Sequence, residues 1–178
     1  MYEERQNKNE IKLVVFKLAE EEFGAPIHQV REIHRLVEIT RVPRAPRFIE
    51  GVINMRGKVM PVIDLRKRFD LPMNAPEEQQ RIMEVEVEGQ VISMIVDAVT
   101  EVISVGVDAI EQPPAMIADI GGDYLTGVAK LPGRIVILLN FNKILSAHEA
   151  HQIEQSSVES LPEPSKPASL PDPSQEGE

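Results

Sequence analysis

The chain of 178 residues contains no cysteine and no tryptophan, and only 4% of its residues are aromatic. Without cysteine there are no disulfide bonds, thiol nucleophiles or thiolate metal ligands, which is typical of proteins from a reducing compartment. Because the apolar share is still 42%, the core must consist of valine, isoleucine and leucine with methionine as filler. This composition favours short β-strands.

Long apolar runs are also missing. The longest, Ile135 to Leu139, falls far short of the roughly 20 residues that span a bilayer. The first ten residues, MYEERQNKNE, are polar and contain no apolar signal core. We therefore expect a soluble intracellular protein that does not insert into membranes.

Two stretches of the chain share one hairpin pattern. Residues 48–69 read FIEGVINMRGKVMPVIDLRKRF, in which two apolar, β-branched segments flank a polar turn. Residues 124–145, YLTGVAKLPGRIVILLNFNKIL, repeat this pattern at a shift of 76, which pairs Gly57 with Gly133. Two copies of one hairpin indicate two copies of one module.

An earlier hairpin is repeated in the same way. The segment beginning IKLVVFKL and continuing to EFGAPIHQVREI has its counterpart in MEVEVEGQVISMIVDAVTEVI, at a shift of 69. This shift pairs Val30 with Val99. The second copy therefore carries seven extra residues between its hairpins, in a longer loop within residues 104–123 that contains Pro113-Pro114.

Copies of about 60 residues with several short strands predict small closed barrels. We expect an all-β protein of two five-stranded SH3-like or OB-like antiparallel barrels related by pseudo-symmetry, with short helices at the connector and the C-terminus. The predicted organisation is a flexible N-terminus at 1–10, a first barrel at 11–71, a connector at 72–80, a second barrel at 81–147, a short terminal helix at 148–155, and a disordered tail rich in Pro, Ser and Glu at 156–178.

The formal net charge of −10 is unevenly distributed. Residues 11–70 hold 12 basic and 8 acidic side chains, whereas residues 71–148 hold 4 basic and 11 acidic ones. A basic first module and an acidic second one suit different partners, or head-to-tail contacts between related modules. Ordinary solvated surfaces are an equally good interpretation.

The sequence offers little for catalysis. No glycine-rich phosphate loop is present, and His148 and His151 lack the spacing of a zinc-protease motif and a third ligand. Asp64 and Asp97 fall at predicted strand ends, where we expect carboxylates that accept backbone N–H groups rather than an acid–base pair. We expect no enzyme activity, no cofactor and no metal.

Basic residues in the first module raise the alternative of a double barrel that binds single-stranded nucleic acid. They are Arg41, Arg44, Arg47, Arg56, Lys58 and Arg66 to Arg68. Such binding needs stacking aromatics among the basic residues, and only Phe48 and Phe69 lie near them. The acidic total also opposes polyanion binding, so protein binding ranks first. For Arg56, at the hairpin tip, a structural clamp and a partner contact are equally open.

Several motifs in order resemble one family. FGAPIHQVREI, EGVINMRGKVMPVIDLRKRF, GQVISMIVDAVTEVI and DYLTGVAKLPGRIVILLNFNKIL are similar to the CheW family of bacterial chemotaxis coupling proteins over residues 11–147. Met55 stands where the family usually has leucine, a near-isosteric exchange. Kinase, phosphotransfer and receiver motifs, found in the relatives CheA and CheV, are missing, so the chain resembles the stand-alone adaptor.

The resemblance implies a fold of two five-stranded barrels and a non-catalytic adaptor. It would couple methyl-accepting chemoreceptors to the regulatory domain of the histidine kinase CheA, and join other CheW-like domains in receptor arrays, in the cytoplasm at the inner face of the membrane. No nucleic acid would be bound. By position, the receptor site would comprise Ile27, Val30, Glu32, Arg56, Val99 and Val102, and the kinase-facing surface Glu111 and Met116, which match an arginine and a phenylalanine in some relatives.

Overall fold

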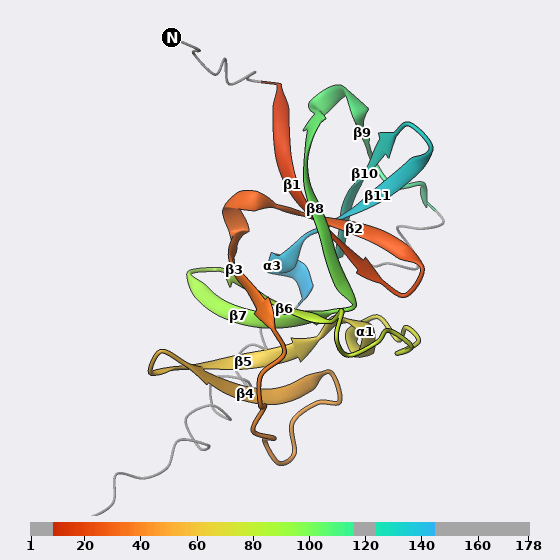
Figure 1. Ribbon diagram of the computed structural model, residues 1–178. Coiled ribbons are helices and arrows are strands. Elements are labelled where there is room, and N and C mark those ends of the chain that lie inside the picture. Colours follow the sequence, from red (N-terminus) through yellow and green to blue (C-terminus); the bar gives the residue numbers. More distant parts are fainter. Residues whose placement is uncertain (1–8, 116–123, 145–178) are drawn as a thin grey trace, which may run out of the picture.

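The computed structural model describes residues 9–115 and 124–144, and short strands with a valine- and isoleucine-rich inner face make up most of these residues (Figure 1). In chain order the elements are β1 (Glu10–Leu18), β2 (Glu21–Pro26), the 3-10 helix η1 (Ile27–Gln29), β3 (Val30–Arg35), β4 (Ile49–Met55), β5 (Lys58–Asp64), α1 (Leu65–Arg68), β6 (Arg81–Val87), β7 (Gln90–Val96), β8 (Ala98–Gly106), the 3-10 helix η2 (Val107–Ala109), β9 (Ile110–Glu111), β10 (Leu125–Leu131), β11 (Arg134–Leu139) and α3 (Phe141–Ile144).

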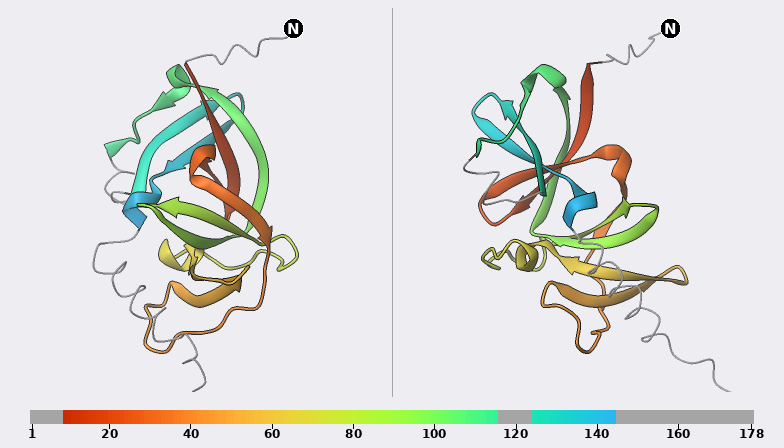
Figure 2. Two further views of the ribbon diagram at one scale, coloured as in Figure 1. Left: turned by 90° about the vertical axis from the view of Figure 1, so that its left-hand side faces the viewer. Right: turned by 180° about the vertical axis from the view of Figure 1, so that it is seen from behind.

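The strands form two sheets that lie one above the other, with α1 and α3 near their junction (Figure 2). The first sheet has the strand order β8-β1-β2-β11-β10-β9, and the second has the order β3-β6-β7-β5-β4. Each sheet contains one parallel pair, β2 with β11 and β5 with β7, besides its antiparallel pairs. The all-β prediction is confirmed, although the barrels are not purely antiparallel and β9 adds a sixth strand to the first sheet.

The chain crosses between the sheets twice. It leaves the first sheet after β2, builds the whole second sheet within residues 30–96, and returns at β8. Each sequence repeat thus gives its first hairpin to one sheet and its remaining strands to the other. The predicted division into barrels at 11–71 and 81–147 is therefore wrong, because the two related hairpins exchange places.

The other boundaries lie partly outside the described residues. The connector 72–80 contains neither helix nor strand, and α1 ends just before it. The first strand already begins at Glu10, within the segment predicted to be a flexible N-terminus. The helix predicted at 148–155 and the tail predicted at 156–178 lie outside the part that the structure describes.

A shared core joins the two sheets. One cluster of buried side chains takes Phe16 and Ala25 from the first sheet and Met83 and Met94 from the second, and Phe141 of α3 completes it. A smaller cluster lies within each sheet. Since the largest apolar cluster belongs to both sheets, its burial stabilises their association as well as each sheet alone.

The β4–β5 hairpin has the tight turn that its sequence indicates. Met55 pairs with Lys58, which leaves a loop of only Arg56 and Gly57. Both loop residues have positive φ, 55° and 80°, as the type I′ turn of a two-residue hairpin requires. The turn holds Arg56 at the tip of the hairpin.

Candidate functional site

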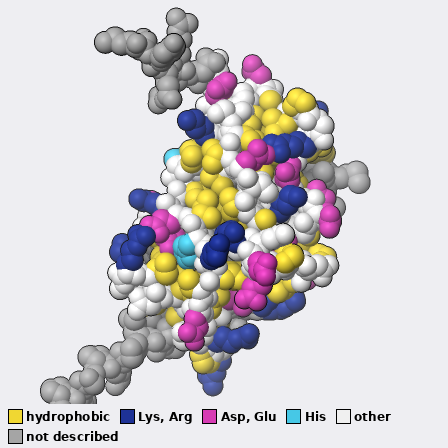
Figure 3. Space-filling model, in the orientation of Figure 1, with side chains coloured by type: hydrophobic (Ala, Val, Ile, Leu, Met, Phe, Trp, Pro, Cys, Tyr) yellow, Lys and Arg dark blue, Asp and Glu magenta, His cyan; other side chains and the backbone are white. Residues whose placement is uncertain are grey.

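The third strand of each repeat borders the junction between the sheets. β3 is an edge strand of the second sheet and β8 an edge strand of the first. Hydrophobic side chains gather between η1–β3 on one side and β8 on the other, with charged side chains of both signs around them (Figure 3). We call the surface formed by η1, β3, the first half of β8 and the tip of the β4–β5 hairpin the junction face.

Four of the predicted receptor-site residues supply apolar area to this face. Val30 and Val99, which the repeat pairs with each other, are both partly buried against the shared core. Val102 lies opposite Val14, a shared-core residue, in the β1–β8 register, yet it is 55% exposed. Ile27 of η1 is 41% exposed. The structure therefore brings residues from both repeats to one apolar, partly open surface.

The two charged residues predicted for this site form an ion pair. Arg56 Nη1 lies 2.5 Å from Glu32 Oε1, and the two side chains are 76% and 37% exposed. The pair joins β3 to the tip of the β4–β5 hairpin, at opposite ends of the strand order of the second sheet. Arg56 thus bridges the hairpin tip and β3, while most of its side chain stays open to solvent.

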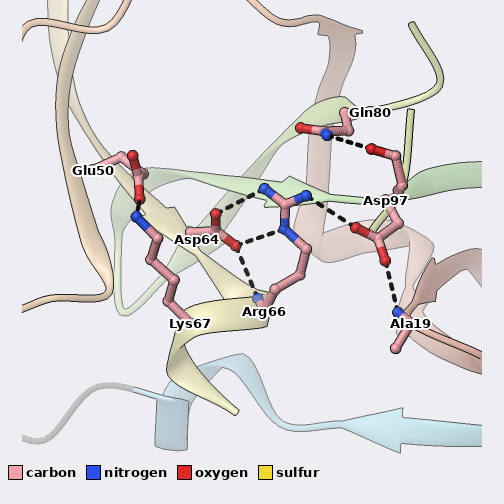
Figure 4. Close-up of polar contacts among 8 residues, drawn as sticks. Ala19, Glu50, Asp64, Arg66, Lys67, Gln80 and Asp97 are labelled. Atoms are coloured by element: carbon pink, nitrogen blue, oxygen red, sulfur yellow. Dashed lines mark hydrogen bonds and ion pairs between the residues drawn. The ribbon is translucent and has the colours of Figure 1, made fainter. Parts of the chain in front are cut away.

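A buried ionic network lies where the chain crosses between the sheets (Figure 4). Arg66, 4% exposed, donates from Nη2 and Nε to the carboxylate of Asp64 at 2.8 and 3.0 Å, and from Nη1 to Asp97 Oδ1 at 3.1 Å. Burial lowers the pKa of the Arg66 guanidinium, but its hydrogen bonds to Asp64 and Asp97 and their charges outweigh burial and raise that pKa above its usual range. Arg66 is therefore a permanent cation between two buried carboxylates.

Both carboxylates of this network also accept backbone N–H groups, as predicted. Asp64 Oδ1 accepts from the N–H of Arg66 at 2.9 Å and so caps α1. Asp97, between β7 and β8, accepts from the N–H of Ala19 at 2.6 Å in the β1–β2 turn. Their role is structural: Asp97 ties the returning crossover to the first hairpin. Nowhere in residues 9–115 and 124–144 do three or more His, Cys, Asp or Glu side chains gather as a metal site would require.

Residues 12–149 match the family model described as "CheW-like domain". The chain belongs to the CheW-like domain family. It is 34% identical over 136 residues to the chemotaxis protein CheW of Klebsiella aerogenes, a match that covers 76% of this chain and 82% of that protein. It is 31% identical over 151 residues to CheW of Treponema pallidum, with coverage of 83% and 89%.

Solved structures show the same relationship for this CheW-like chain. The scaffolding protein TtCheW of Thermoanaerobacter tengcongensis superimposes with a TM-score of 0.73 at 41% sequence identity, and the match covers 78% of this chain and 94% of TtCheW. The fold of two β-rich units predicted from the resemblance is thereby confirmed.

The residues predicted to face the kinase lie away from the junction face or outside the description. Glu111 is in the short strand β9 at the far edge of the first sheet, where its carboxylate lies 2.9 Å from Lys130 Nζ. Its side chain is 57% exposed. Met116 lies outside the described residues, as do His148 and His151. Among the helices of the described residues, none is long and apolar enough to cross a membrane.

Aromatic side chains of the CheW-like chain are used internally. Phe48 is 9% exposed and packs beneath the guanidinium of Arg68, whose Cζ lies 4.6 Å from the ring centroid. Phe69 stacks on Phe23, with 6.4 Å between the ring centroids. A single-stranded nucleic acid would need these rings as open stacking platforms, so the packing of Phe48 and Phe69 weighs against that alternative.

Proposed function

We propose that this CheW-like chain is a non-catalytic chemotaxis adaptor, which couples the cytoplasmic tip of a methyl-accepting chemoreceptor to the regulatory domain of a CheA-type histidine kinase. Membership of the family supports the chemotaxis role. The junction face carries the receptor contact, with Ile27, Val30, Glu32, Arg56, Val99 and Val102 as its residues. The adaptor works in the cytoplasm at the inner face of the membrane, where receptors hold it.

The chemistry of the junction face supports this proposal. It combines exposed apolar side chains, Ile27 and Val102, with a mostly exposed cation, Arg56. A helix docks in this way when its apolar side chains enter a groove and a charge at the rim sets the register. Because β3 and β8 come from different sheets, a helical hairpin lying between them contacts both halves of the adaptor.

The surface around Glu111 and Met116 is our proposed contact with the kinase. Glu111 lies in β9, which follows the half of β8 that the junction face does not include, so we expect a partner there not to compete with one on the junction face. Further CheW-like domains are expected to join the same assembly through barrel-to-barrel contacts. One adaptor then holds receptor and kinase together without chemical turnover.

Exchange of Val102 for aspartate is the first test of the receptor contact. The new carboxylate would lose its water in the apolar interface, so binding to a soluble receptor signalling fragment should weaken at least about tenfold. A tenfold loss corresponds to only about 1.4 kcal/mol of binding free energy. Ile135→Asp is the matched control, since Ile135 is also a strand residue of the first sheet and is 57% exposed against 55% for Val102. Calorimetric titration of both variants, with the CheA regulatory domain titrated alongside, measures the effect.

If the Ile135 and Val102 variants lost the same amount of receptor affinity, the junction face would not be the site. Loss of both partners by Val102→Asp alone would indicate misfolding or a shared site. Selective loss of the receptor fragment, with kinase binding retained, supports the assignment.

Charge reversal at Arg56 separates the clamp from the partner contact. Exposed ion pairs contribute about 0–1 kcal/mol, so Arg56→Glu should leave the melting temperature nearly unchanged. We expect it to weaken receptor binding about tenfold or more through repulsion at the rim. The swapped variant, Arg56→Glu with Glu32→Arg, restores an ion pair of reversed polarity, and we expect it not to restore binding. Full recovery in the swap would mean that Arg56 acts only as a clamp.

A further inference from the structure

The connector between β3 and β4 carries an arginine at every third position. Residues 41–47 read RVPRAPR, and Arg41, Arg44 and Arg47 are all exposed. Arg47 lies 3.7 Å from Asp70, whereas the described residues provide no ion-pair partner for Arg41 or Arg44. We call residues 36–48 the arginine connector. Two of its three cations are available to a ligand.

A pocket of about 400 Å³ opens beside this connector. Leu36, Val37 and Ile39 line it from the connector, Met73 lines it from the segment after α1, and Arg41 lies among them. Val37 and Met73 are 37% and 47% exposed. A cavity of roughly 150 Å³ is enough for a benzene-sized group, so this pocket has room for an aliphatic side chain and a neighbouring proline ring.

The carboxylates of the pocket are mostly neutralised within the protein. Asp64 is bound by Arg66, and Glu50 is paired with Lys67. Glu77 is the remaining lining carboxylate, on the exposed segment before β6. Arg41 is left as the unpaired cation of the lining, so the pocket suits a ligand that places an anion next to an aliphatic group.

The chain itself contains two such ligands. Residues 160–165 read SLPEPS and residues 169–174 read SLPDPS, so one hexapeptide occurs twice with only Glu and Asp exchanged. Each has one leucine followed two positions later by a carboxylate. Residues 149–178 contain seven acidic side chains and one basic side chain in all, which complements the arginine connector.

The described chain ends against α1, the helix that also contributes to the pocket lining. The carbonyl oxygen of Ile144 accepts a hydrogen bond of 2.9 Å from Arg68 Nε, and Arg66 of the same four-residue helix lines the pocket. The helix is only about 6 Å long. Sixteen residues separate Ile144 from the first hexapeptide. A chain of this length spans roughly 20–24 Å as a random coil and about 24 Å as a helix, so both hexapeptides can reach the pocket.

We propose that this pocket binds one of the chain's own Ser-Leu-Pro-acid-Pro-Ser segments. The leucine, Leu161 or Leu170, lies against Val37 and Met73, and the carboxylate of Glu163 or Asp172 pairs with Arg41. Tethering over so short a linker gives each segment an effective concentration of the order of 1 mM. A segment whose free peptide bound with a dissociation constant of about 0.1 mM would fill the pocket about ten to one.

An occupied pocket lowers the affinity of this surface for other ligands. Any acidic, proline-containing peptide that docks on the arginine connector has to displace the tethered segment. At the occupancy above, its apparent affinity falls about tenfold. The lining of the pocket shares no residue with the junction face, so we expect the contact to form without a receptor.

Paramagnetic labelling of the full chain tests the contact. Because the chain lacks cysteine, Ala168→Cys places a single nitroxide between the two hexapeptides. In the isotopically labelled protein we expect severe broadening of the amide signals of residues 37–41 and 73, and none at Gly133 in the β10–β11 turn. Changing Arg41 and Arg44 to Glu should abolish the broadening, as should changing Leu161 and Leu170 to Ser.

Lys12→Glu with Lys17→Glu is the matched control, because it makes the same change in net charge at two exposed positions of β1. Broadening that survives the arginine changes, or that the lysine changes remove equally, would overturn the proposal. Equal broadening in a mixture of nitroxide-bearing chains without isotope label and isotopically labelled chains without nitroxide would also overturn it, since this would place the contact between copies.

Discussion

Replacing Arg66 with methionine is expected to lower the free energy of unfolding by about 3–5 kcal/mol, the cost of leaving a buried charge without its partner. Asp64 and Asp97 are 1% and 5% exposed, so both carboxylates would stay buried after the guanidinium is removed. The contacts of Asp97 at the crossover and the cap of α1 by Asp64 would both be weakened. As the chain has no tryptophan, urea unfolding followed by circular dichroism is the suitable measurement.

Lys143→Met is the control for this variant. Lys143 is the repeat counterpart of the residue next to Arg66, lies in the equally short helix α3, and is exposed. Its loss should change the stability by less than about 0.5 kcal/mol. A similar small effect in Arg66→Met would mean that the two carboxylates are accommodated without the guanidinium, for instance by binding protons, and that the network does not hold the crossover in place.

Arg66 also shows why sequence reasoning missed part of the site. It stands in the run Arg66-Lys67-Arg68, which the sequence suggests as part of a basic surface for nucleic acid rather than as a source of a buried ion pair. Three neighbouring cations in a helix point in three directions, so one of them faced the interior at the junction. Asp64, expected to be a cap at the end of an apolar strand, was the available signal, because a capped first turn brings the side chain two residues later close to the carboxylate.

The strands and hairpins could be predicted from the sequence, but the assignment of each hairpin to one of the two sheets could not. Both repeated hairpins form with the strand pairs that alternation and turn residues indicate. Internal similarity, however, makes the first hairpin of one copy as compatible with the strands of the other copy as with its own. The shared core resolves this choice through long-range packing, which is not encoded in any local pattern.

The predicted receptor-site residues were reached in two different ways. The equivalence of Val30 and Val99 follows from the repeat alone, and the structure places both against the shared core. The Arg56–Glu32 pair could not be found from spacing, because 24 residues separate the two side chains and only closure of the second sheet brings them together. Whether the receptor uses these residues is the subject of the Val102 and Arg56 experiments.

Among the glycines that the structure describes, Gly51 is the one at which we expect an added methyl group, in Gly51→Ala, to be most destabilising. Gly51 has a φ of 147°, and a Cβ there would lie 2.0 Å from the carbonyl oxygen of Thr40. That oxygen accepts from the N–H of Val52 at 2.8 Å, and the N–H of Thr40 donates back to Val52 at 2.9 Å. Backbone cannot rotate away as a side chain can, so the bridge that holds the arginine connector on β4 must open. We expect a loss of about 3–4 kcal/mol from overpacking and backbone strain together.

Two other glycines serve as controls for this prediction. At Gly57 nothing lies within 4 Å of the added Cβ, so Gly57→Ala should cost only the strain of its positive φ, about 1–2 kcal/mol. Gly127, the repeat counterpart of Gly51, would place a Cβ 3.1 Å from the oxygen of Glu111, a contact that a shift of a few tenths of an ångström relieves. Unfolding of all three variants in urea should therefore rank Gly51→Ala well above the others. Equal losses of unfolding free energy in Gly51→Ala and Gly127→Ala would contradict this ranking. The backbone of the arginine connector would then shift as easily as that of β9, and the Thr40–Val52 bridge would not hold the pocket beside Arg41 rigid.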